Sequence, residues 1–194
     1  MKELEAIRGI DVYLIDQLLK ERVNADSKIL DAGCGSGRNI HYIIENNFKV
    51  SGIDASEVCI HQLRSKYPKI KGNFHHSSLE DFTSNTQFDF IICNAVLHFA
   101  RDHEHFSEMF SSLINLLAKG GILFIRMTSD IGLSLKSTGR KGVFDLPDGS
   151  ERYLITRKHI DALLSKHSLS LLEPVKTVKV EDLRSMTTIV VTKN

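Results

Sequence analysis

The sequence predicts an α/β fold in which helices cover both faces of a largely parallel sheet. Strand-like and helix-like segments alternate along the chain, as they do in repeated βαβ units. Residues 29–32 read as a buried strand that runs straight into a glycine-rich turn opening a helix. Residues 88–93 are almost continuously apolar, which is typical of a strand buried on both faces. These features favour a parallel sheet.

The expected helices are recognisable by apolar faces and end signals. The first is amphipathic, because its apolar residues recur on one helical face. Tyr67-Pro68 ends the third, while Asp102 and Thr156 have side chains suited to capping a helix N-terminus. The expected helices are 7–22, 40–46, 56–66, one that begins after Asp102 and ends before Gly120, and 157–166.

The expected strands are 29–32, 50–54, 88–93, 122–125, 168–172 and 186–192. Residues 128–151 are rich in Gly, Ser and Lys and have few apolar repeats, which predicts a loop or lid over residues 128–155. We expect a single domain over residues 1–194, with residues 1–26 as a short N-terminal helical cap. No internal repeat is evident.

Composition is that of an ordinary globular domain. The 194 residues are 42% hydrophobic and 25% charged, and the formal net charge is +1. This balance provides no broad field to gather nucleic acid or an anionic membrane, so neither partner is expected. The first residues lack the apolar run of a signal peptide, and no stretch approaches ~18 uninterrupted apolar residues. We therefore expect a cytoplasmic protein.

Cysteines and histidines show no metal-ligand or disulfide pattern. Cys34, Cys59 and Cys93 are scattered, so we expect reduced, mostly buried thiols; the alternative of a catalytic Cys34 has no neighbouring base to support it. His103 and His105 are two residues apart and would not share a helix face. No metal is expected.

The glycine turn predicts a nucleotide-shaped ligand. Gly33, Gly35 and Gly37 permit a tight turn with positive φ and a close approach of the backbone to a ligand. Asp31 precedes them and can meet a cation. A dinucleotide fingerprint needs its third glycine or alanine one place later, where this chain has Arg38. The spacing favours a ligand other than NAD.

Asp54 supports a ribose-containing ligand. It ends the next predicted strand, 21 residues after Gly33, close to the roughly 20-residue spacing that returns an acid to the glycine turn. A carboxylate there can accept hydrogen bonds from both ribose hydroxyls.

Four motifs stand in order along the chain: Leu30-Asp-Ala-Gly-Cys-Gly-Ser-Gly37, Gly52-Ile-Asp-Ala-Ser56, Phe88-Asp-Phe-Ile-Ile-Cys-Asn94 and Leu117-Ala-Lys-Gly-Gly-Ile-Leu-Phe124. In these motifs the chain resembles the class I S-adenosylmethionine-dependent methyltransferases. The resemblance covers about residues 5 to 194, and Gly37-Arg38-Asn39 is most similar to the small tellurite-resistance type branch. It implies a Rossmann-like, doubly wound, seven-stranded sheet with an antiparallel last strand, in a three-layer α/β/α sandwich.

The resemblance implies S-adenosylmethionine as methyl donor and S-adenosylhomocysteine as product. Asp31 would face the methionine portion, Asp54 the ribose, and Asn94 the α-amino group through its backbone carbonyl. Ser78 stands where many relatives place an aspartate for the adenine amino group, so a neutral acceptor replaces a charged one. Glu80 or Asp81 can compensate, or both can be solvated. The implied cofactor residues are Asp31, Ala32, Gly33, Cys34, Gly35, Arg38, Asp54, Ala55, Ser78, Leu79 and Asn94.

The methyl acceptor is expected near the segment that follows the strand 88–93. His98 is a candidate base because its ordinary pKa lies near neutrality, although packing against the cofactor pocket explains it equally well. Arg126 and Arg140 are candidates to hold an anionic acceptor, or surface ion-pair partners. The segment 128–155 would form the lid over this site.

The sequence therefore predicts an S-adenosylmethionine-dependent methyltransferase that acts on a small molecule, as a monomer or small homo-oligomer. Asn94-Ala-Val-Leu97 lacks the Asn-Pro-Pro-aromatic pattern of enzymes that methylate amino groups in nucleic acids and glutamine. The alternatives are a cofactor-binding protein without turnover, a nicotinamide oxidoreductase, and a methyltransferase with a macromolecular acceptor.

Overall fold

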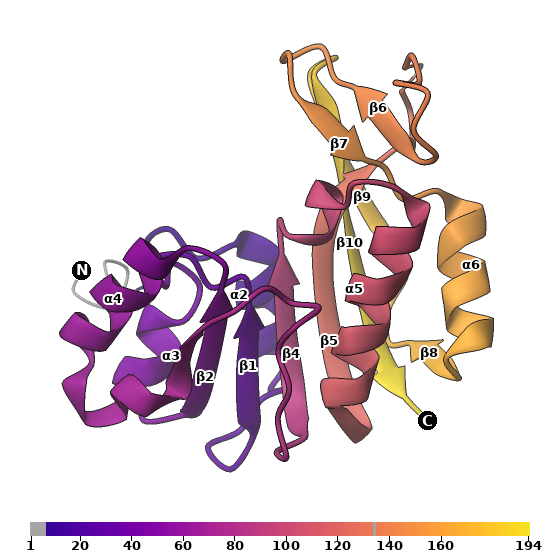
Figure 1. The fold of residues 1–194 in the computed structure, drawn as a ribbon. Coiled ribbons are helices and arrows are strands. Elements are labelled where there is room, and N and C mark those ends of the chain that lie inside the picture. Colours follow the sequence, from indigo (N-terminus) through magenta and orange to yellow (C-terminus); the bar gives the residue numbers. More distant parts are fainter. Residues whose placement is uncertain (1–6, 134) are drawn as a thin grey trace.

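A central sheet organises the chain, as the computed structural model of residues 7–133 and 135–194 shows (Figure 1). Within these residues eight strands form the sheet, in the order β3-β2-β1-β4-β5-β10-β8, with β9 also paired to β10. The strands are β1 (Lys28–Ala32), β2 (Lys49–Asp54), β3 (Phe74–His76), β4 (Phe88–Asn94), β5 (Leu117–Ser129), β8 (Leu169–Leu171), β9 (Lys176–Val180) and β10 (Arg184–Lys193).

The pairing confirms the predicted fold class. Strands β1 to β5 pair in parallel, and β10 returns antiparallel beside β5. The main path contains the seven expected strands, and β9 adds an eighth. It does so because β10 has ten residues: residues 184–188 pair with β9 and residues 191–193 with β8.

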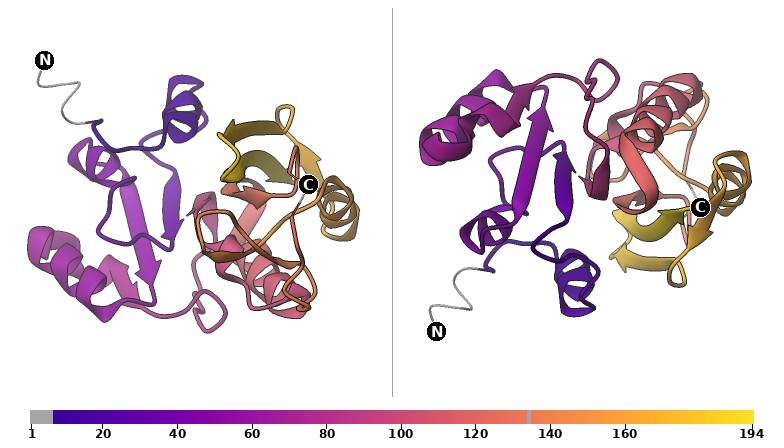
Figure 2. Two further views of the ribbon diagram at one scale, coloured as in Figure 1. Left: turned by 90° about the horizontal axis from the view of Figure 1, so that it is seen from above. Right: turned by 90° about the horizontal axis from the view of Figure 1, so that it is seen from below.

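Helices cover both sides of the sheet, which gives three layers (Figure 2). On one side Leu14, Ile43 and Ile60 join one apolar core, and on the other Phe106 and Ile160 join a second. The helices that supply them are α2 (Val12–Leu19), α3 (His41–Glu45), α4 (Glu57–Lys66), α5 (His103–Leu116) and α6 (Arg157–Lys166); η1 (Pro68–Asn73) and η2 (Leu97–Phe99) are short 3-10 turns.

Helix boundaries follow the capping residues. The predicted caps Asp102 and Thr156 accept hydrogen bonds from the backbone N–H groups of His105 (2.9 Å) and His159 (3.0 Å). The helix predicted at 157–166 is confirmed. The first helix is shorter than the predicted 7–22, because Asp11 caps α2 at residue 12.

The predicted strand 122–125 is the centre of a longer one. Helix α5 ends at Leu116, and β5 begins at once and runs through Gly120 and Gly121. Gly120 therefore lies inside a strand rather than in the connection after the helix. Its φ of +74° bends the backbone within β5.

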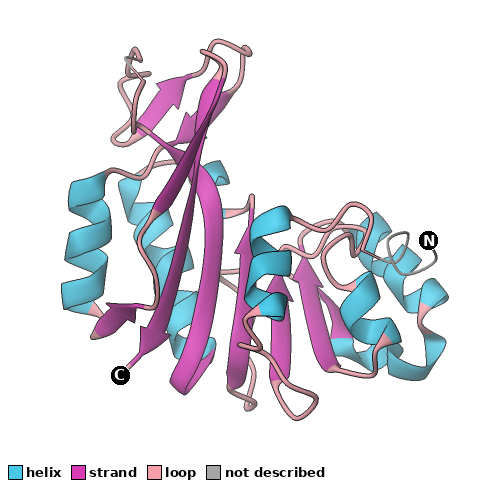
Figure 3. Cartoon of the chain, turned by 180° about the vertical axis from the view of Figure 1, so that it is seen from behind, coloured by secondary structure: helices cyan, strands magenta, loops and turns pink. Residues whose placement is uncertain are grey.

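The segment expected as a loop or lid contains a hairpin. Strands β6 (Val143–Asp145) and β7 (Glu151–Tyr153) pair antiparallel, and we call residues 143–153 the hairpin lobe. Val143 and Tyr153 are fully buried. Strands β5 and β10 extend beyond their neighbours toward this lobe, which stands over the carboxyl ends of the parallel strands (Figures 1 and 3). Strands of three residues are too short to show periodicity in the sequence.

Among the described helices, α5 is the longest at 14 residues, and none combines the length and apolar character needed to cross a membrane.

Candidate functional site

The glycine turn connects β1 to α3 with an unusual backbone. Gly33, Gly35 and Gly37 have φ of +85°, +51° and +89°. The N–H groups of Gly33 and Cys34 both donate to the Ile53 carbonyl, at 2.8 and 2.9 Å. At Gly35 an added Cβ would meet no atom within 4 Å, so the turn is open on that side. A ligand can approach the backbone there.

Position 33 requires glycine because of a neighbouring side chain as well as because of its positive φ. A Cβ at this position would lie 2.1 Å from Cγ2 of Val96, which follows β4. Only glycine lets the end of β1 and the chain after β4 come this close.

Asp54 holds the turn in shape. Its Oδ2 accepts from the N–H of Gly35 and its Oδ1 from the N–H of Ser56, both at 2.8 Å. Each carboxylate oxygen has a second lone pair that can accept another donor. Asp54 is thus a structural link between β2 and the glycine turn and also an acceptor at the cavity wall.

A first cavity of about 390 Å³ opens beside this carboxylate. Its wall is mainly apolar, and its polar side chains are those of Asp54, Glu80, His105 and two serines. It is lined by Gly33, Ile53, Asp54, Ala55, Ser77, Ser78, Leu79, Glu80, Ala95, Val96, Phe99, His105 and Met109. This composition fits a flat, partly apolar ligand with a few hydrogen-bonding groups.

Ser78 and Glu80 are both engaged within the protein. The Ser78 hydroxyl donates to Oδ2 of Asp81 at 2.7 Å. Nδ1 of His105 accepts from the Arg101 N–H at 3.0 Å, so its proton is on Nε2, which donates to the Glu80 carboxylate. This bond fixes a carboxylate at the cavity wall two residues after Ser78.

Asp31 carries a buried carboxylate at the end of β1. It is 1% exposed, and neither of its oxygens accepts a hydrogen bond from the described residues. Burial, with a further contribution from the negative Asp54 and opposed by Arg38, raises the pKa of Asp31 to about 7. An unpaired buried carboxylate is unfavourable, so this group is suited to a cationic ligand.

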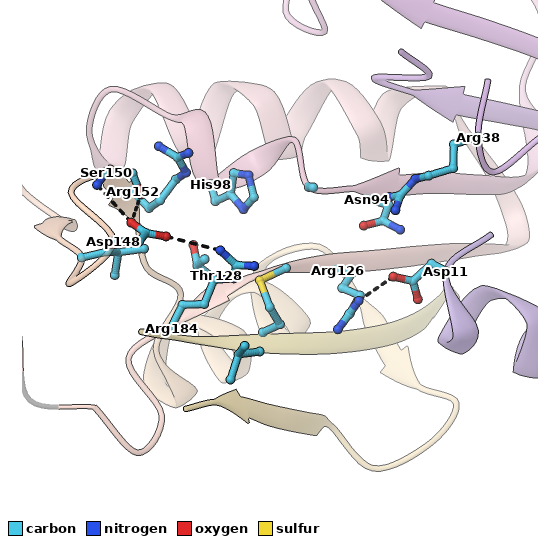
Figure 4. Close-up of a pocket in the computed structure, with 14 residues that line it drawn as sticks. Asp11, Arg38, Asn94, His98, Arg126, Thr128, Asp148, Ser150, Arg152 and Arg184 are labelled. Carbon is cyan, nitrogen blue, oxygen red and sulfur yellow. Dashed lines mark hydrogen bonds and ion pairs between the residues drawn. The ribbon is translucent and has the colours of Figure 1, made fainter. Parts of the chain in front are cut away.

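A second cavity of about 320 Å³ meets the first at Ala95, which lines both. It lies between the carboxyl ends of β4 and β5 and the hairpin lobe, and Figure 4 shows most of its side chains. It is lined by Asp11, Arg38, Asn94, Ala95, His98, Arg126, Thr128, Leu146, Asp148, Ser150, Arg152, Val180, Arg184 and Met186.

One end of this second cavity is closed by an ion pair. Nη1 of Arg126 donates to Oδ2 of Asp11 at 2.5 Å, and its guanidinium lies 4.9 Å from the centre of the Tyr13 ring. Asn94 and Arg38 lie at the same end (Figure 4). Arg126 therefore joins α2 to β5, and its charge is already balanced by Asp11.

His98 lies farther along the same cavity. It is 7% exposed, and its Nδ1 has no hydrogen-bond partner among the described residues. Burial first, and then the positive charges of Arg152 and Arg184, lower its pKa to about 4. The ring is consequently neutral at pH 7 and can accept a proton from a molecule in the cavity.

The fold brings most of the candidate residues to these two cavities. Asp31 and Ala32 end β1, and Cys34 and Gly35 belong to the glycine turn; none of these four residues lines either cavity. The first cavity contains Gly33, Asp54, Ala55, Ser78 and Leu79; the second contains Arg38, Asn94, His98 and Arg126.

Arg140 lies elsewhere. It is exposed, pairs with Glu151, and lines a separate surface hollow beside α5. Burial raises the pKa of both Cys34 and Cys93, so these thiols are not activated nucleophiles. Within residues 7–133 and 135–194, no three His, Cys, Asp or Glu side chains gather in an arrangement that could hold a metal ion.

Sequence reasoning missed Asp148, Arg152 and Arg184. The first two belong to the hairpin lobe and the third to the start of β10. The glycine and proline within residues 147–149 are the signal in the sequence for a hairpin turn. No sequence pattern indicates that this turn lies beside residue 184.

Comparisons with known proteins agree with this geometry. Residues 29–121 match a family described as "Methyltransferase domain". An uncharacterised methyltransferase of Schizosaccharomyces pombe is 31% identical over 113 residues, which cover 55% of this chain and 74% of that protein.

A ubiquinone biosynthesis O-methyltransferase of Rickettsia bellii is 29% identical over 126 residues, or 63% of this chain; the match spans only about half (51%) of the relative. A solved structure of the Burkholderia thailandensis 1,6-didemethyltoxoflavin-N1-methyltransferase contains 1,6-didemethyltoxoflavin and S-adenosylhomocysteine. It superposes with a TM-score of 0.70 at 18% identity, over 97% of this chain and 78% of its own, which shows a shared fold.

Proposed function

Because this chain belongs to the methyltransferase family, we propose that it transfers a methyl group from S-adenosylmethionine to a small molecule. The observation that carries the proposal is the junction of the two cavities at Ala95, beside an open glycine turn and an unpaired buried carboxylate. One cavity is suited to a nucleoside, and the other adjoins it with a neutral histidine.

Residues of the first cavity and the glycine turn fit the cofactor. The free lone pairs of Asp54 would accept from the ribose hydroxyls, while the apolar wall at Leu79 and Val96 would enclose the adenine. The carboxylate of Asp31 is buried and has no hydrogen-bond partner among the described residues. The α-ammonium group of the cofactor would therefore stabilise a negative charge that is otherwise unfavourable. Arg38 lies at the same end of the second cavity as Asn94 and has the charge to hold the carboxylate.

The adenine amino group would be recognised differently from the usual pattern. Ser78 is neutral, and its hydroxyl proton is directed at Asp81. Glu80, held by His105, provides the carboxylate at this wall. We infer that Glu80 compensates for the serine.

When bound, S-adenosylmethionine would supply an electrophilic methyl group, with sulfur taking the electron pair of the carbon–sulfur bond as the new bond forms. The protein's part is to align the acceptor and exclude water, which can supply about 7 to 11 kcal/mol in well-oriented reactions. The neutral ring of His98 lines the second cavity, and we infer that it takes the proton of a hydroxyl acceptor. An acceptor that is already deprotonated would need no base.

Calorimetry with S-adenosylmethionine, S-adenosylhomocysteine and NAD tests the cofactor. We expect micromolar binding of the first two and none of NAD; binding of NAD alone would favour the oxidoreductase alternative and contradict the proposal. Release of S-adenosylhomocysteine in the presence of pooled metabolites separates an enzyme from a cofactor-binding protein without turnover.

Two finer assignments belong to the same proposal. The small acceptor is supported by the second cavity, which the hairpin lobe lines on one side, and a macromolecular acceptor is the alternative. Membership of the tellurite-resistance type branch rests on Gly37-Arg38-Asn39 alone and stays a prediction.

A further inference from the structure

The second cavity has an excess of positive charge. Four arginines line it, Arg38, Arg126, Arg152 and Arg184, against two acids. Arg126 is balanced by Asp11, and Arg38 lies at that same end (Figure 4). The charge relevant to an acceptor is therefore at the opposite end, beneath the hairpin lobe.

Arg152 and Arg184 approach that end from different elements. Arg152 projects from β7 and Arg184 from the start of β10, and Figure 4 shows both near His98 and Thr128. Nη1 of Arg152 donates to the Glu151 carbonyl at 2.7 Å, and Nη1 of Arg184 donates to Oδ2 of Asp148 at 3.3 Å. A guanidinium has five N–H donors, so most of the donors on both side chains stay available.

The acid at this end is a weak counterion. Asp148 lies in the turn of the hairpin lobe, where it already accepts from the N–H (3.0 Å) and hydroxyl (2.5 Å) of Ser150. Its contact with Arg184 is long and involves a side chain that is nearly half exposed. Asp148 thus pairs only with Arg184, and no acid pairs with Arg152 among the described residues.

Apolar groups complete the same space. Leu146, Val180 and Met186 line the second cavity. The guanidinium of Arg152 lies 4.8 Å from the centre of the Phe99 ring, which lines the first cavity. An occupant would therefore meet positive charge together with an apolar wall.

We propose that the methyl acceptor is an organic oxyanion with an apolar body, a carboxylate or a phosphate, whose charged group binds Arg152 and Arg184. The inference rests on the proposed function, because it concerns what fills the site beside the cofactor. Planar guanidinium groups bind carboxylate and phosphate oxygens in pairs, which gives orientation as well as affinity. An anion here also offsets the positive field at His98.

Matched probes in protein saturated with S-adenosylhomocysteine test this inference. Benzoate and phenyl phosphate are the oxyanions, and benzamide is the neutral control of the same shape, all titrated at constant ionic strength. We expect both oxyanions to bind with about tenfold or greater preference over benzamide. The arginine Nε–Hε signals in NMR spectra report which side chains respond.

Four variants separate the charges. Arg152→Gln and Arg184→Gln should each weaken benzoate binding by about tenfold. Asp148→Asn removes the competing charge while keeping an acceptor for Ser150, so benzoate should bind about two- to fivefold more tightly. Arg157→Gln, an exposed arginine on α6 paired with Asp161, is the control and should change nothing.

The increase expected for Asp148→Asn cannot come from a damaged fold. Equal binding of benzoate and benzamide, absence of saturable binding of either oxyanion, or unchanged binding in both arginine variants would overturn the inference. Failure of S-adenosylhomocysteine to bind in the preceding calorimetry would instead contradict the proposed function.

Discussion

Replacing Asp31 by Asn should stabilise the ligand-free protein and weaken its binding of the cofactor. The carboxylate is buried and has no hydrogen-bond partner in the part of the chain that the structure describes, and its pKa is raised from 3.8 to about 7. Asn removes the charge but keeps nearly the same shape. The substitution therefore separates the energetic effect of the buried charge from that of packing.

The size of the effect follows from proton linkage. Since the pKa is higher in the folded chain, the unfolded chain loses its proton first as pH rises, and stability falls between about pH 4 and pH 7. At 1.36 kcal/mol per pKa unit, the shift corresponds to roughly 4 kcal/mol lost above pH 7. The Asn amide would itself be buried without partners at a cost of about 1–3 kcal/mol, so a net gain of about 1–3 kcal/mol is expected at pH 8.

Urea unfolding without ligand, at pH 5, 6.5 and 8, measures this difference. The stability advantage of Asp31→Asn should grow with pH across this range, because only the wild type loses stability through this group. If the wild-type stability relative to the variant is the same at pH 5 and pH 8, the reasoning on the buried charge is wrong.

Cofactor binding provides the second measurement. An ammonium beside Asp31 would lower its pKa again, so S-adenosylhomocysteine should release close to one proton on binding near pH 6. Calorimetry in buffers of different ionisation enthalpy counts that proton. Asp31→Asn should abolish the release and weaken binding by about 1.5–3 kcal/mol. Proton release that persists in the variant would assign it to another group.

Three further changes test other parts of the site. Asp54→Ala should weaken S-adenosylhomocysteine binding by about 1–3 kcal/mol, measured by calorimetry, and unchanged affinity would remove its ribose role. His98→Gln should lower turnover about 100-fold while cofactor affinity changes little. Because the pKa of His98 is about 4, a plot of wild-type kcat/KM against pH should show no inflection from this residue near pH 6.5. Normal turnover of the variant at all pH values would exclude His98 as the base. Gly33→Ala should destabilise the fold by about 2–4 kcal/mol in urea unfolding, because Gly33 has a positive φ and an added Cβ would lie 2.1 Å from Val96. Val96→Ala in the same chain should recover part of this lost stability. If the effects of the two substitutions are strictly additive, the steric argument is wrong.

Local signals were sufficient for much of the fold. The side chains of Asp102 and Thr156 cap their helices because such caps act over three residues. The glycine turn and Asp54 were predicted from spacing, since one βαβ unit brings the carboxyl ends of adjacent parallel strands together. These features depend on neighbours in the chain or on one crossover.

Contacts between distant segments were not predictable in this way. The pair Asp11–Arg126 joins residues 115 apart, and it uses the guanidinium that the sequence suggested for an acceptor. Glu80 was considered for the adenine wall, but its bond to His105 depends on how α5 packs over the first cavity. Such pairs depend on tertiary packing, which no local pattern encodes.

By itself, the sequence determined the α/β class, the glycine turn, and the acids that suit a cofactor containing ribose and an ammonium group, because these follow from local backbone requirements and strand order. Only the tertiary structure decided which residues line the second cavity. The antiparallel return of β10 and the short hairpin lobe bring Arg152 and Arg184 to His98, and these segments are too short or too far apart in sequence for periodicity to connect them.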